Sequence, residues 1–90
     1  MDKGKRIQKL LAITKEFIAR KDMDCNVLLD ITTLDCNARK EKVILQIVYP
    51  KYKLELKVEL GDIELRMTED EFKEHVLIPG VHFLEVHTVN

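Results

Sequence analysis

The chain has 90 residues, of which 46% are hydrophobic and 34% charged, and its net charge is −1. This length supports one domain covering residues 1–90, and the composition excludes an intrinsically disordered protein. No apolar run follows the basic start or approaches the length of a membrane span, so we expect neither a signal peptide nor a membrane protein.

The first segment, residues 5–21, is expected to form an amphipathic helix. Its apolar residues recur at spacings of three and four; they are Ile7, Leu10, Leu11, Thr14, Phe17 and Ile18. Residues 1–21 carry a net charge of +5, against −6 for residues 22–90. Such a helix either binds an anionic partner or neutralises an acidic body on which it packs. If the partner is nucleic acid, the candidate contacts are Lys3, Lys5, Arg6, Lys9 and Arg20.

Alternation of apolar and polar residues predicts an antiparallel meander of four strands, at about residues 25–34, 43–49, 54–60 and 63–67. The second strand is apolar at nearly every position and is expected to be central. Pro50 predicts a tight turn that sets Tyr49 opposite Tyr52. Gly61 predicts either a hairpin turn or a one-residue bulge, since both restore the alternation that is broken there.

The end of the chain is expected to hold a short helix and a last strand. Thr68 and Glu71 have the spacing of a capping box, which predicts a helix at about residues 69–77 that Pro79 and Gly80 end. Residues 81–89 then form a strand whose neighbour in the sheet the pattern leaves open. The expected fold is therefore α+β: an N-terminal amphipathic helix packed on an antiparallel four-stranded meander, then a short helix and a C-terminal strand.

No motif for catalysis, phosphate binding or metal binding occurs in the sequence, and the histidines and cysteines lack the spacing of zinc ligands. Cys25 begins the first expected strand and Cys36 follows its end, and the two ends of that strand lie about 30 Å apart at ~3.3 Å per residue. This separation argues against a disulfide between them and favours a reducing, cytoplasmic location. We therefore expect a protein that is not an enzyme and needs no metal or cofactor.

Two surfaces are candidates for protein binding. Alternate residues of the central strand leave a half-apolar second face of the sheet, which either the short helix or a partner covers. The candidates on this face are Leu28, Ile44 and Val48. The acidic stretch 62–74 is either solvated or docks on a basic partner. The candidates there are Asp62, Glu64, Glu69 and Asp70.

The sequence identifies neither the partner nor the oligomeric state, and a homodimer is one arrangement that it allows. Single-domain size and the lack of a chemical motif favour a small non-enzymatic protein-interaction module that regulates or inhibits a macromolecular partner. Phages and other mobile elements encode regulators of this form. The alternative is a nucleic-acid-binding domain that uses the basic N-terminal helix.

Overall fold

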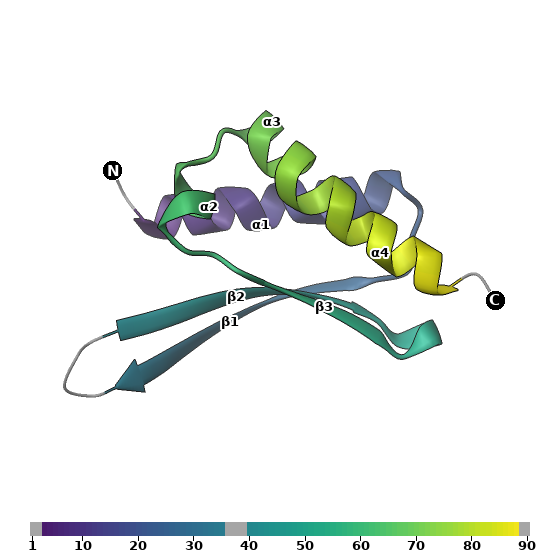
Figure 1. Cartoon of the computed structure of the whole chain (residues 1–90), viewed down its shortest axis with the longest axis horizontal. Helices are drawn as coiled ribbons and strands as arrows, with labels where there is room; N and C mark the ends of the chain where they lie inside the picture. Colours follow the sequence, from purple (N-terminus) through teal and green to yellow (C-terminus); the bar gives the residue numbers. More distant parts are fainter. Residues whose placement is uncertain (1–2, 36–39, 89–90) are drawn as a thin grey trace.

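The computed structural model describes residues 3–35 and 40–88 as an α+β fold, with helices stacked on one sheet (Figure 1). Helix α1 (Lys3–Arg20) comes first, followed by strands β1 (Asn26–Asp35), β2 (Lys40–Tyr49) and β3 (Leu54–Glu59), with the 3-10 turn η1 (Pro50–Tyr52) before β3. The rest is helical: α2 (Asp62–Arg66), α3 (Glu69–Phe72), the π-helical segment η2 (Lys73–Leu77) and α4 (Ile78–Thr88). The α+β class, the N-terminal helix and the antiparallel sheet are confirmed.

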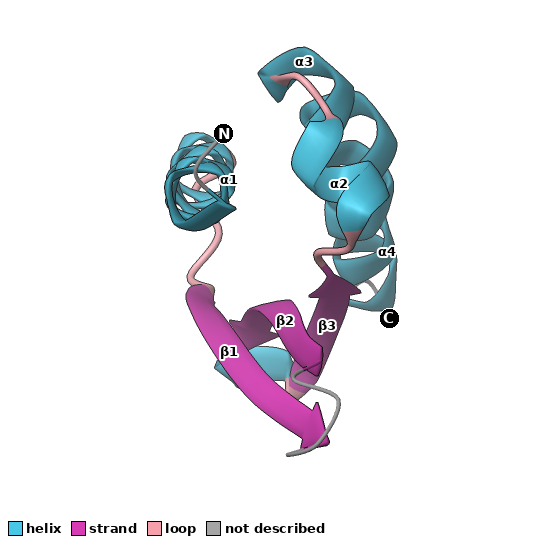
Figure 2. Ribbon diagram, turned by 90° about the vertical axis from the view of Figure 1, so that its left-hand side faces the viewer, coloured by secondary structure: helices cyan, strands magenta, loops and turns pink. Residues whose placement is uncertain are grey.

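All helices lie on the same face of the sheet. Figure 2 shows α1 above β1 and the C-terminal helices above β3, and none of the described helices lies on the opposite face of the sheet. The core fills the space between the layers, and its centre is the inward side of β2, where Val43, Leu45 and Ile47 are at most 3% exposed. These residues face the helices, as the alternation of the sequence predicts.

Helix α1 agrees with the predicted amphipathic helix. Ile7, Leu10 and Ile18 on its apolar stripe are buried against the sheet. Thr14 on the same stripe is completely buried, and its hydroxyl donates a hydrogen bond of 2.8 Å to the carbonyl of Leu10. This bond satisfies the one polar side chain of the buried stripe, so Thr14 costs the core little.

The strands pair in the order β1-β2-β3, but the register of β2 with β3 differs from the expectation. Tyr49 lies opposite Leu54 rather than Tyr52, because Pro50–Tyr52 form a 3-10 turn that ends at Lys53 in the left-handed region, with φ of 56°. The register is therefore shifted by two residues. Because side chains alternate with a period of two, such a shift leaves each residue on the face predicted for it.

The fourth expected strand is wrong, since Asp62–Arg66 form the short helix α2. Gly61 occupies the N-cap position, and its N–H donates to the Glu64 carboxylate at 2.9 Å. The alternation seen in the sequence has another cause here. Ile63 is 72% exposed while Leu65 is buried, because residues two apart on a helix point to nearly opposite sides.

The expected C-terminal strand is also wrong, because helical structure runs without interruption from Glu69 to Thr88. The helix begins with the predicted capping box, in which the Glu71 N–H donates to the Thr68 hydroxyl at 3.2 Å and the Thr68 N–H donates to the Glu71 carboxylate at 3.1 Å. Val81 and Leu84 are at most 1% exposed and lie on one helical stripe. Tertiary burial of this stripe stabilises a helix where local pattern favours a strand.

Pro79 does not end the helix, and the π-helical segment η2 stands directly before this part of the chain. A proline inside a helix lacks an N–H and its ring crowds the carbonyl four residues earlier. Here the last N–H before the proline, that of Ile78, donates to the carbonyl of Lys73, five residues back. The wider π turn accommodates the helix interior around Pro79 and changes the direction in which later side chains point.

Candidate interaction surface

The outer face of the sheet, defined here by Leu28, Ile44 and Val48, carries the apolar residues that the sequence assigns to a second face. In the register of β1 with β2, Leu28 lies opposite Gln46, between the rows of Ile44 and Val48. Leu28 is 50% exposed and the other two are half-buried. The second helix does not cover this face, because α2, α3 and α4 all lie on the other side of the sheet (Figure 2).

Strand β3 borders this apolar area with a column of charged side chains. Glu55 accepts a hydrogen bond of 2.8 Å from the Gln46 side chain and forms an ion pair of 3.3 Å with Lys57. Glu59 pairs with Lys42 of β2 at 3.8 Å. On the outer face, β1 and β2 therefore contribute the three apolar residues together with the charged Asp30, and β3 contributes charged side chains; most of the described charges, although not Asp30, are paired.

The four acidic candidates lie in the helical layer, away from the outer face. Asp62 and Glu64 belong to the first turn of α2, and Glu69 and Asp70 to the first turn of α3. Glu64 caps the Gly61 N–H, as described above. Glu69 forms an ion pair of 3.1 Å with Lys9 of α1. These carboxylates stabilise helix starts and the contact with α1, so the structure does not bring the two sets of predicted contacts together.

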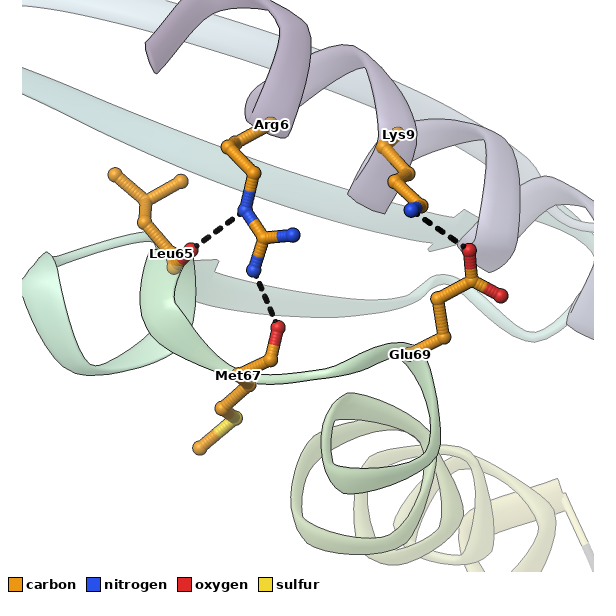
Figure 3. A network of polar contacts seen from close by, with 5 residues as sticks. All are labelled: Arg6, Lys9, Leu65, Met67 and Glu69. Carbon is orange, nitrogen blue, oxygen red and sulfur yellow. Dashed lines mark hydrogen bonds and ion pairs between the residues drawn. The ribbon is translucent and has the colours of Figure 1, made fainter. Parts of the chain in front are cut away.

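Two of the five basic candidates of α1, Arg6 and Lys9, contact other elements of the fold (Figure 3). The Arg6 guanidinium donates from Nε to the carbonyl of Leu65 at 2.9 Å and from Nη2 to that of Met67 at 2.5 Å. These carbonyls lie at the C-terminal end of α2, where backbone acceptors lack helical partners and a positive charge is favourable. The interpretation of α1 as a helix that neutralises an acidic body therefore applies to Arg6, as it does to Lys9.

The remaining basic candidates are exposed. Arg20 forms an ion pair of 2.6 Å with Glu16, one turn earlier. Within the described residues, Lys3 and Lys5 form no ion pair, and both are exposed at the start of α1. Only this short segment of the predicted nucleic-acid surface is left with uncommitted charge.

A shallow hollow of about 250 Å³ lies between α1 and the C-terminal helices. Ile13 and Phe17 provide its apolar lining, and the cations Arg20, Lys21 and Lys73 surround it together with Glu16. Lys21 is engaged, because it pairs with Glu85 at 3.6 Å and stands 5.8 Å from the centre of the Phe17 ring. The sequence does not reveal this hollow, since it depends on the distance between two helices far apart in the chain.

A second apolar feature that the sequence prediction missed is the outer side of α4. Ile78, Phe83 and Val86 are each about half exposed, at 54%, 46% and 52%. The expectation of a strand over residues 81–89 concealed it. The spacing of Leu77, Val81 and Leu84 is the sequence signal for a helix. A helix that buries these residues leaves Ile78, Phe83 and Val86 exposed to solvent.

No group of metal-ligating side chains occurs within the part of the chain that the structure describes. Cys25 at the start of β1 is half-buried and carries a free thiol. Burial and the neighbouring Asp24 carboxylate raise the pKa of this thiol above its ordinary value of 9.0, so it is a weak nucleophile near neutral pH. Cys36 lies outside the described residues.

Among the described residues, no helix is long and apolar enough to cross a membrane. Comparisons of the chain with protein families, with curated proteins and with solved structures found no match.

Proposed function

We propose that this chain is a small non-enzymatic protein-interaction module that regulates or inhibits a macromolecular partner, and that the outer face of its sheet is the binding surface. The observation that carries the proposal is the apolar area of Leu28, Ile44 and Val48, over which none of the described helices packs. An antiparallel sheet often has one side in water, but that side is then usually polar. Aliphatic residues held on adjacent strands instead suit a partner that buries them.

The arrangement of charge supports this surface over the acidic helix starts. A partner that buries the outer face meets Leu28, Ile44 and Val48 on β1 and β2 and paired charges on β3. Asp30 of β1 is the described charge on this face without an ion pair, so it is the charge that such a partner must match. Two of the acidic candidates, by contrast, already stabilise the fold, since Glu64 caps the Gly61 N–H and Glu69 pairs with Lys9.

Single substitutions on the outer face test the proposal. Ile44→Asp and Val48→Asp place a carboxylate in the apolar area without touching the inner core, so circular dichroism should show folded proteins. In a tagged pull-down from nuclease-treated lysate of the native host, both variants should lose a partner that the unchanged chain retains. Ile63→Asp is the matched control, because Ile63 is an exposed isoleucine on α2, away from this face.

Retention of the same partner by both folded variants would contradict the proposal. Loss of all retained material on nuclease treatment of the unchanged chain would instead favour the nucleic-acid alternative. Lys3 and Lys5 would then be the first residues to change, since they are the predicted nucleic-acid contacts of α1 for which the described residues provide no ion pair.

A further inference from the structure

The open edge of β1 is the one long backbone surface that the described residues leave without a partner. The sheet order β1-β2-β3 places β1 at one side, and its ten residues exceed the six of β3. Each edge strand presents unpaired N–H and C=O groups that can pair with another extended chain. The direction of these groups along β1 can be worked out from one hydrogen bond.

The Leu60 N–H donates to the Val43 carbonyl at 2.8 Å, so the backbone groups of Val43 point toward β3. Backbone groups alternate sides along a strand, so those of Ile44 point toward β1. The residue opposite Ile44 is Asp30, whose groups therefore point back toward β2. By the same alternation, the N–H and C=O groups of Val27, Leu29 and Ile31 point away from the sheet, to the open edge.

From Asn26 to Thr32, before the register irregularity at Thr33 and Asp35, the edge lacks most of the features that usually prevent strand addition. Residues 26–34 contain no Lys, Arg, Pro or Gly, and Asp30 is their one charged residue. Leu28 on the outer face is 50% exposed, and Ile31 on the inner face is 56% exposed. Apolar side chains on both faces of this strand therefore lack a neighbour on the side of the open edge.

A hollow of about 460 Å³ lies beside this edge, where α1 passes over the start of β1. Met23, Cys25 and Val27 form its apolar part, with Lys15 and Ala19 of α1 above. An added strand would direct every second side chain to the inner face, into this hollow. The site thus combines backbone groups for pairing with space for alternate side chains, the two requirements of recognition by strand addition.

We propose that the open edge of β1 binds an extended segment of a partner protein, which adds to the sheet as a further strand. The segment carries small apolar residues at alternate positions, which face the hollow, and basic or polar residues between them, near Asp30. A second copy of the chain is the less suitable occupant. Because α1 lies above β1 (Figure 2), a copy paired through its own β1 would bring its α1 to the same place.

This inference deepens the proposed function and rests on it for the nature of the partner. The probes are acetylated peptides as long as β1, with valine at alternate positions and either lysine or glutamate between them. The lysine peptides should slow hydrogen exchange of the Val27, Leu29 and Ile31 amides, and the glutamate peptides should bind more weakly because of Asp30. Before peptide is added, these three amides should exchange faster than those of Leu28 and Asp30.

Ile31→Pro removes an outward N–H, which an edge position tolerates, while the matched control Ile31→Ala keeps it. With both variants folded, as shown by slow exchange at Leu28 and Asp30, the proline variant should bind the lysine peptide about tenfold more weakly than the alanine variant. Equal affinity of the two variants, or no peptide protection of the three amides at millimolar concentration, would overturn the inference.

The test separates this inference from the proposed function. Ile44 and Val48 have side chains on the outer face and backbone groups inside the sheet, so Ile44→Asp and Val48→Asp should bind the peptide like the unchanged chain. Loss of the native partner from these variants with peptide binding retained would support both. Retention of the native partner by them would refute the outer face, whatever the edge does.

Discussion

Arg6 offers the most decisive test of how the fold is held together. Its two hydrogen bonds join α1 to carbonyls 59 and 61 residues further along the chain. A hydrogen bond from a charged group contributes about 1.5–3 kcal/mol, and these bonds are only partly buried, so water can replace part of that value. We expect Arg6→Ala to lower the free energy of unfolding by about 2 kcal/mol.

Arg20→Ala is the matched control, because it removes the same kind of side chain from the same helix. The Arg20 side chain is 76% exposed and pairs with Glu16 on the surface. Pairs of this kind contribute about 0.3–0.5 kcal/mol. Urea unfolding followed by circular dichroism measures both variants. If the two lose equal stability, the Arg6 hydrogen bonds do not hold α1 to the rest of the fold, and Arg6 returns to the set of candidates for nucleic acid.

Two further predictions concern individual side chains. Thr68→Ala should cost about 1 kcal/mol through loss of the helix cap, and it should raise the pKa of Glu71, which hydrogen bonds from the Thr68 backbone and side chain hold below its ordinary value of 4.5. Because the pKa of Glu71 is lower in the folded chain than in the unfolded one, its contribution to stability is complete above pH 4.5 and is lost as the pH falls through the folded pKa. If NMR shows that the Glu71 carboxyl of the folded chain titrates like that of an unfolded glutamate, this prediction is wrong. The Cys36→Ser variant leaves Cys25 as the one thiol, and iodoacetamide at pH 8 should alkylate it more slowly in the folded chain than in the urea-unfolded chain. Adding Asp24→Asn should accelerate the reaction of the folded chain. Equal rates for the folded chain, the unfolded chain and the Asp24→Asn variant would refute the raised pKa.

The sequence was sufficient where one periodic pattern had one structural solution. The apolar stripe of α1 and the alternation of β1, β2 and β3 predicted their inner faces correctly. The candidates Leu28, Ile44 and Val48 fell on the outer face even though the register of β2 with β3 was wrong by two residues. Faces depend on the parity of the register, whereas the register itself depends on the backbone of Lys53, which no sequence pattern specifies.

Prediction failed where a short pattern fits two structures. Ile63 and Leu65 alternate in burial both in a strand and across one turn of helix, so the sequence did not distinguish α2 from a hairpin. Pro79 and Gly80 normally mark a helix end, but burial of the stripe that includes Leu77 and Val81 outweighs that local preference. The ion pair of Lys9 with Glu69 and the hydrogen bonds of Arg6 were beyond prediction, because they join α1 to residues about sixty positions away.

The π-helical segment η2 decides which side of α4 the protein shows to its surroundings. A residue in an α-helix turns the chain by about 100°, so a regular helix continued from Phe72 would bring Pro79, Phe83 and Val86 toward the sheet. The wider turn rotates α4 so that Leu77, Val81 and Leu84 are buried instead. Helical phase, and not composition, thus separates the core of α4 from its exposed apolar stripe. Because a π turn holds one residue more than an α turn, deleting one residue of 73–76 should give a regular helix that keeps Val81 and Leu84 in the core.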